Sequence, residues 1–172
     1  MSVPLPTFRR VRLTQQCVIH PQDKGGNYLP CASEDWVLFV SLAADGEKII
    51  LRTEHRCLPI KPGGALLLPP NVFHGVRVEG RENYERYALH FRPSLLPADM
   101  TGLLLSPFQG GEGDVYYPQA DAFGLRGYFE QVMACDELDD DMRDAALAAR
   151  IQALLTQVVY MSRKRRGAPR PA

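Results

Sequence analysis

The chain lacks the features that would place it in a membrane or attract it to nucleic acid. Its 172 residues contain no run of about 18 apolar residues, so no transmembrane helix is expected. The N-terminal "MSVPLPTFRR" has no charged-then-apolar order, so it is not a secretory signal. Lysine plus arginine number 20, as do aspartate plus glutamate, which leaves no net charge to attract nucleic acid. We therefore expect a cytoplasmic protein without a membrane partner.

The chain also lacks the cysteine and histidine patterns of metal and redox sites. Its four cysteines form no C-x-x-C pair and have no zinc-like spacing with the four histidines. Free thiols in a reducing compartment account for them. No G-x-S-x-G, P-loop or dinucleotide-binding fingerprint is present. We therefore expect no enzyme activity, no cofactor and no metal.

What the chain does contain, over residues 1–118, is a series of short strand-like runs separated by glycine and proline. Several such runs at this spacing predict a β-barrel or sandwich. The runs at 36–42 and 48–53 are expected to form a hairpin around "DGE" at 45–47. Pro62, with Gly63 or Gly64 at positive φ, is expected to form a later turn. The runs are "WVLFVSL" (36–42), "KIILRT" (48–53), "ALLL" (65–68), "VFHGVRV" (72–78) and "YERYALHF" (84–91).

Residues 119–163 change to helical spacing and predict two helices, the second from about 141 to 163. That helix carries one apolar seam at a 4-3-4-3 spacing, which is typical of a packed helix pair. A second apolar stripe lies beside it. The helix is therefore either an ordinary core helix or the interface of a homodimer. The candidate dimer contacts are Leu147, Ile151, Leu154, Val158 and Met161.

The stretch "KPGGALLLPPNVFHGV" at 61–76 resembles the second motif of the cupins, G-x5-P-x-G-x2-H-x3-N. Gly63, Pro69 and His74 match the motif, and Asn71 replaces its last glycine. Asparagine tolerates a left-handed backbone, so the same turn remains feasible. The preceding strands contain no H-x-H, and one imidazole is a poor site for a transition metal. The resemblance therefore predicts the barrel without the metal.

The wider region, about residues 30–165, resembles the sensor half of AraC/XylS-type transcription regulators. "LLLPP" followed by His74, and "YERYALHF" followed by Pro93, agree with patterns of that family. The resemblance implies a mostly β fold with C-terminal helices, a cupin-like β-barrel or jelly roll followed by two α-helices. Residues 1–118 would form the effector-binding barrel with an N-terminal arm, and 119–163 the helical dimerisation segment. Residues 164–172 would be a linker toward a helix-turn-helix domain that is absent from this chain.

The same resemblance implies a small-molecule effector, such as a sugar or small carboxylate, a homodimer, and contact with DNA only through the missing domain. Leu5 and Phe8 of the arm would either fold over the ligand or belong to a frayed terminus. Two alternatives stay open: a cupin-type metalloenzyme, and a dimerisation module that binds no ligand. His74 is either a hydrogen-bonding group for the ligand or a structural histidine, and Trp36 either stacks on a ligand or belongs to the core. The candidate ligand-binding residues are His74, Val76, Arg86, Ala88, His90 and Trp36.

Overall fold

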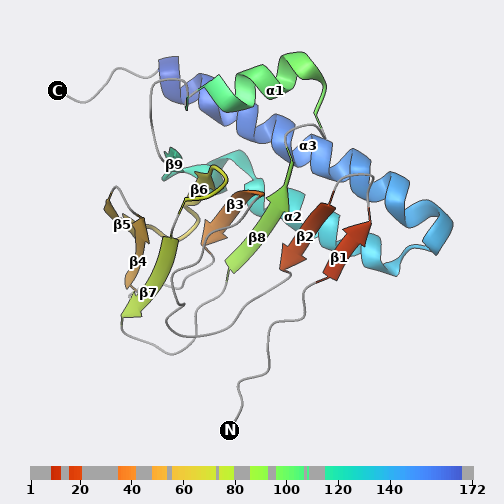
Figure 1. Ribbon diagram of the computed structural model, residues 1–172, viewed down its shortest axis with the longest axis horizontal. Coiled ribbons are helices and arrows are strands. Elements are labelled where there is room, and N and C mark those ends of the chain that lie inside the picture. Colours follow the sequence, from red (N-terminus) through yellow and green to blue (C-terminus); the bar gives the residue numbers. More distant parts are fainter. Residues whose placement is uncertain are drawn as a thin grey trace, which may run out of the picture.

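The computed structural model describes residues 9–12, 16–20, 35–41, 48–53, 56–72, 74–79, 86–92, 96–106, 108 and 115–167. They form two β-sheets and a group of helices (Figure 1). The strands are β1 (Arg9–Arg12), β2 (Gln16–His20), β3 (Trp36–Ser41), β4 (Lys48–Thr53), β5 (Cys57–Ile60), β6 (Ala65–Leu68), β7 (His74–Glu79), β8 (Arg86–Phe91) and β9 (Val115–Tyr117). The α-helices are α1 (Ala98–Leu105), α2 (Leu125–Met133) and α3 (Asp140–Gly167), with short 3-10 helices at Ala120–Phe123 and Ala134–Glu137. The predicted fold class, mostly β with C-terminal helices, is confirmed.

The strands form a six-stranded sheet in the order β1-β2-β8-β3-β6-β9 and a three-stranded sheet in the order β5-β4-β7. All described pairs are antiparallel. The helices lie together on one side of the larger sheet (Figure 1). The other face of that sheet packs against the smaller one around a separate apolar cluster. The molecule therefore has three layers, and the inner face of each sheet is the face turned toward the other sheet.

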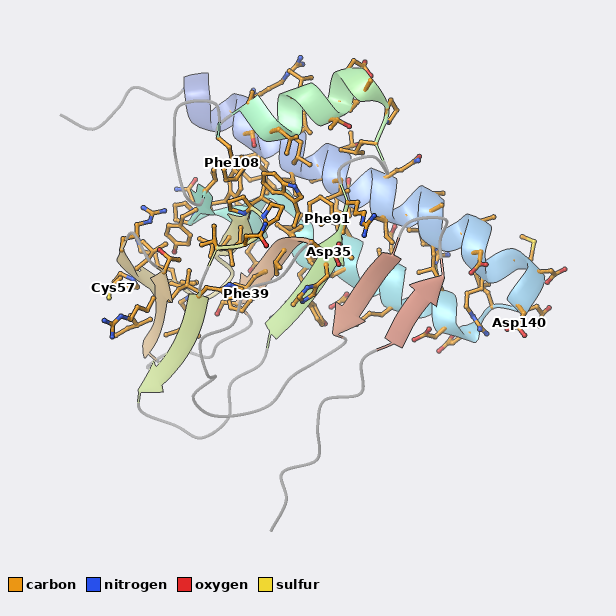
Figure 2. The ribbon with its side chains drawn as sticks, viewed as in Figure 1. Asp35, Phe39, Cys57, Phe91, Phe108 and Asp140 are labelled. Carbon is orange, nitrogen blue, oxygen red and sulfur yellow. The ribbon has the colours of Figure 1, made fainter. Side chains whose placement is uncertain are left out.

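The central strand β3 shows why the apolar run "WVLFVSL" is continuous. Leu38 and Val40 belong to the cluster under the helices, whereas Val37 and Phe39 belong to the cluster between the sheets. Successive side chains of a strand point to opposite faces, so a strand covered on both faces needs apolar residues throughout. Figure 2 labels Phe39, on the inner face of the larger sheet, and Phe91 of β8, on its helix-covered face.

The predicted hairpin of β3 and β4 is wrong. β3 pairs with β6 and β8, and β4 pairs with β5 and β7 in the other sheet. Both runs are strands within one residue of their expected bounds, but periodicity does not say which strand pairs with which. A chain that crosses from one sheet to the other, as it does between β3 and β4, produces the same apolar runs as a chain of local hairpins.

The turn between β5 and β6 has the expected geometry. Gly63 has φ of 73°, and the N–H of Gly64 donates to the carbonyl of Lys61 at 2.9 Å. Asn71, at the turn after β6, has φ of 63°, so the left-handed backbone expected of the asparagine is confirmed. Both turns set the direction in which the chain enters the strands of the candidate site.

Among the described strands and α-helices, five were not expected from the sequence: β1, β2, β5, α1 and the short strand β9. Pro59 lies inside β5, opposite Ile50, and argues against a strand from sequence alone. β5 is an edge strand, where the missing N–H of proline costs no ladder hydrogen bond on the open side. α1 has no side-chain hydrogen bond capping its N-terminus, so the usual start signal is absent.

Candidate functional site

The candidate site is the layer between the two sheets. On β4, Ile49, Leu51 and Thr53 are buried while Arg52 is exposed, so alternate residues of this strand point inward. On β3 the inward residues are Val37, Phe39 and Ser41. The apolar part of this inner layer, called here the inner cluster, consists of Val37, Phe39, Ile49, Leu51, Ile60, Leu66 and Leu68.

Two hydroxyl groups that the sequence did not single out lie in this layer. Ser41 is fully buried at the end of β3, and Thr53 is 8% exposed at the end of β4. The Thr53 Oγ1 atom accepts a hydrogen bond from the N–H of Arg56 at 3.2 Å. The alternation of "KIILRT" could have placed Thr53 on the inner face, because it shares parity with Ile49 and Leu51.

His74 begins β7, directly opposite Thr53, and is half-buried. Its Nδ1 atom lies 3.0 Å from the carbonyl oxygen of Val72. A carbonyl oxygen only accepts, so Nδ1 carries a proton, and the neutral ring then presents Nε2 as an acceptor. The hydrogen bond fixes the ring of His74 against its own strand. Both readings of His74, as a ligand-contacting group and as a structural group, are compatible with this contact.

Ala88 and His90 lie on the inner face of β8. Tyr87, Leu89 and Phe91 of the same strand belong to the cluster under the helices, which confirms the expected division of this strand by parity. Ala88 is 2% exposed and lies opposite Phe39, while His90 is half-buried and lies opposite Val37. Because alanine has a small side chain, side chains fill less of the inner face at this point, next to the ring of Phe39, than elsewhere.

The remaining two positions on the strands are assigned by register. Position 86 is opposite Ser41, and position 76 is opposite Leu51. Residues directly opposite one another in an antiparallel pair share a face, so both positions belong to the inner layer. Five of the six candidate ligand-binding positions are therefore brought together on the inner faces of β7 and β8.

Trp36 is the exception, since its position lies apart from the other five, and its contact with a ligand stays a prediction. It packs against the cluster under the helices, and its ring meets that of Phe108 edge to face with centroids 4.8 Å apart. Trp36 lies opposite Phe91, whose side chain also points to the helices. The alternation of β3 therefore places Trp36 on the far side of the sheet from His90. The alternative reading, that it is a core residue, is the one that the geometry supports. Leu5 and Phe8 lie outside the described residues.

The seam residues of α3 are buried within one chain. Leu147, Ile151, Leu154, Val158 and Met161 are at most 3% exposed and pack under the larger sheet with α1 and α2. These residues are thus covered by their own chain, and their place at a dimer interface stays a prediction. The face of α3 that remains exposed carries Ala149, Gln152, Ala153, Thr156, Tyr160 and Arg163. Dimerisation itself stays a prediction.

The described part of the chain contains neither a group of metal-binding side chains nor a membrane-spanning helix. No group of three or more His, Cys, Asp or Glu side chains in it could hold a metal ion. None of the described helices combines the length and the apolar character needed to cross a bilayer, and α3, although 28 residues long, is rich in charge.

Comparison with known proteins agrees with this architecture. The model of a family described as "AraC-like ligand binding domain" matches residues 40–171. The solved structure of apo ToxT from Vibrio cholerae has a TM-score of 0.53 and 10% identity, over 84% of this chain and 55% of that chain. The cupin domain of Cnp3 from Schizosaccharomyces pombe has a TM-score of 0.40 and 15% identity, over 51% of this chain and 65% of that chain.

The chain thus spans 55% of the ToxT chain and 65% of the Cnp3 domain chain. At such identities the likeness to ToxT concerns the fold alone. No curated protein sequence matches the chain significantly.

Proposed function

Because the chain belongs to the family of AraC-like ligand-binding domains, we propose that it senses a small molecule held between its two sheets. The bound state would be passed to an attached DNA-binding domain, so the role is regulatory rather than enzymatic. A ligand has this effect only if it binds one arrangement of the domains more tightly than another.

The observation that supports this proposal best is the mixed chemistry of the inner layer. The inner cluster supplies an apolar wall, while Ser41 and Thr53 add buried hydroxyls and His74 and His90 add half-buried imidazoles. Ligand sites are commonly apolar surfaces with a few well-placed polar groups. These polar side chains place hydrogen-bonding groups beside the apolar wall, as such a site requires.

Thermal-shift screening of the purified chain against sugars, carboxylates and amino acids tests the proposal. A ligand at a hundred times its Kd stabilises the folded state by about 2.7 kcal/mol. For a domain of this size, that corresponds to a rise in Tm of roughly 5–10 °C. His74→Ala should reduce the shift. The matched control is Arg52→Ala, since Arg52 is exposed on the strand beside it and lies opposite Gly75.

Two other results would contradict ligand sensing. Stoichiometric iron, manganese, nickel or zinc in the purified protein would favour a cupin-type metalloenzyme. The absence of any shift across broad libraries would favour a dimerisation module that binds nothing.

The proposal also includes a homodimer, which would form through the exposed face of α3. That face is built from small and polar residues at helical spacing, with Ala149 and Ala153 allowing close approach and Tyr160, 47% exposed, offering an aromatic surface. Sedimentation equilibrium of an Ala153→Glu variant should show a weaker dimer than the unmodified chain. Gln131→Glu, on the exposed side of α2, is the control and should leave the association unchanged.

A further inference from the structure

The short strand β9 contacts the layers on both sides of the larger sheet. Among the strands that the structure describes, it pairs with β6 alone, with Tyr116 opposite Leu66 and Tyr117 opposite Ala65. Successive side chains of a strand point to opposite faces. Tyr116 accordingly packs against the inner cluster, whereas Tyr117 belongs to the cluster under the helices. Two adjacent residues, joined by one rigid peptide, therefore reach the two sides of the sheet.

On the inner side, Tyr116 is held against the turn between β5 and β6. Its hydroxyl accepts the N–H of Lys61 at 2.9 Å. A Cβ added to Gly64 would lie 2.9 Å from that hydroxyl and 3.0 Å from the ring, so the glycine allows the close approach of the ring. The carbonyl of Gly64 accepts the N–H of Ser41 at 3.0 Å, and the N–H of Gly63 donates to the carbonyl of Ser41 at 2.9 Å. The buried end of β3, the turn and Tyr116 are thus joined by direct contacts.

On the helix side, β9 is bonded to α3. The hydroxyl oxygens of Tyr117 and Ser162 are 2.5 Å apart, and both residues are buried. Figure 1 shows β9 at the same end of the molecule as the C-terminal turns of α3. Separating two hydroxyls in a buried cluster is costly, because each loses a hydrogen-bond partner. The contact therefore favours one position of these turns relative to β9.

The chain that follows β9 adds contacts to the same stretch of α3. The carbonyl of Phe123 accepts a hydrogen bond from the side-chain amide of Gln157 at 2.8 Å. The ring of Phe123 meets that of Tyr160 edge to face, with centroids 5.9 Å apart. We call residues 115–123 the connecting segment, because it contacts the turn at the inner layer and also α3 over residues 157–162.

From these contacts we propose that the connecting segment transmits the state of the inner layer to the C-terminal turns of α3. The inference rests on the proposed ligand-sensing function and adds how an occupied site acts on an attached domain. A molecule between the sheets packs against the same apolar side chains as Tyr116, so it shifts that ring and the turn that holds it. Because the two tyrosines are adjacent, the shift changes the contact between Tyr117 and Ser162, and with it the stability of the last turns of α3. Such coupling runs through packed side chains and hydrogen bonds.

The strand β9 is suited to this role because it can move without disrupting a sheet. It has three residues and lies at the edge of the six-stranded sheet, so in the described part of the chain one short ladder resists its displacement. By contrast, β3 is paired on both sides. A small displacement becomes a discrete change where packed groups have only a few favourable arrangements.

The coupling can be measured without a ligand, by perturbing the inner layer with a substitution. Leu66→Val reduces the fully buried side chain opposite Tyr116. Leu66→Met keeps the volume and changes the shape, and it serves as a second variant if the first folds poorly. The matched control is Leu51→Val. Leu51 is also buried in the inner cluster, but its strand β4 has no ladder to β6 or β9.

The readout is hydrogen exchange of α3 in the full chain, measured by mass spectrometry. Residues 158–164 report the C-terminal turns, and residues 144–150 of the same helix are the internal reference. We expect Leu66→Val to raise exchange of 158–164 at least about threefold relative to 144–150, and Leu51→Val by less than about 1.5-fold. A loss of global stability raises exchange in both parts alike, so the ratio isolates the local effect.

A second set of variants tests the route. Tyr117→Phe and Ser162→Ala remove the hydrogen bond between β9 and α3, and each should by itself raise exchange of the C-terminal turns. In either background Leu66→Val should add less than about 1.5-fold, because the inner layer no longer acts on α3 through that bond. Tyr160→Phe keeps an aromatic ring on the same helix and should leave the response to Leu66→Val unchanged.

The outcomes separate this inference from the proposed function. A local response to Leu66→Val that Tyr117→Phe abolishes supports the connecting segment as the route. Equal changes in both parts of α3, an equal response to Leu51→Val, or a response that survives Tyr117→Phe overturns the inference and leaves ligand sensing intact. Failure of every compound in the thermal-shift screen overturns ligand sensing, and with it this inference, whatever the exchange rates are.

Discussion

The hydrogen bond between Tyr117 and Ser162 joins β9 to the C-terminal half of α3, and its removal has a predictable effect. The two hydroxyl oxygens are 2.5 Å apart, and both residues are 4% exposed. A buried hydroxyl that loses its partner costs about 1–3 kcal/mol, whereas removing both partners is nearly neutral. Tyr117→Phe and Ser162→Ala should each lower the free energy of unfolding by about 1–2 kcal/mol.

The double variant should lose no more than one single variant, which corresponds to a coupling energy of at least about 1 kcal/mol. For a chain of this length, each single change should lower Tm by roughly 2–8 °C. Urea denaturation followed by circular dichroism, with calorimetry for Tm, provides both quantities. Tyr160→Phe is the control, because that tyrosine is 47% exposed on the same helix and should change stability by less than about 0.5 kcal/mol. Additive losses in the double variant, with a coupling below about 0.3 kcal/mol, would refute the reasoning.

Three further changes should have distinct effects. Gly63→Ala should destabilise the chain by more than about 1 kcal/mol, since φ is positive and the added Cβ would lie 2.7 Å from the Cβ of Asp121. Gly102→Ala should instead stabilise the chain by up to about 1 kcal/mol, because an added Cβ on this part of α1 meets no other atom. Thermal melts measure both changes in stability. Leu154→Ala should cost about 2–5 kcal/mol in chemical denaturation, and a much smaller loss would contradict its place in the core. Trp36→Phe should leave the affinity for any ligand found in the screen within about twofold, as calorimetry can show, because Trp36 lies on the helix side of the sheet.

Local patterns of the sequence predicted five of the nine described strands, β3, β4, β6, β7 and β8, but not their partners. β4 and β6 have the bounds expected from "KIILRT" and "ALLL", and the parity of "YERYALHF" divided β8 correctly. The partner of β3 is set by loops and by the packing of the two sheets, which short-range periodicity does not encode. For the same reason the sequence could not reveal that His90 lies opposite Val37.

The helical seam shows a second limit of sequence reasoning. A 4-3-4-3 spacing says that one face of a helix is covered, but not whether its own chain or a partner covers it. Leu154 and its neighbours are covered by the sheet and by α1 and α2. Trp36 illustrates the same limit on a strand, because a residue at the edge of an apolar run can point to either layer.

The strand β9 has only three residues, yet its side chains form hydrogen bonds with two parts of the chain that are distant in sequence. The hydroxyl of Tyr116 accepts the N–H of Lys61, 55 residues away, and the next residue, Tyr117, bonds to Ser162, 45 residues away. Contacts of such long sequence separation carry the entropy cost of closing large loops, so they form only after their partners are in place. We therefore expect β9 to take its place late in folding, after the turn between β5 and β6 and the end of α3 have formed.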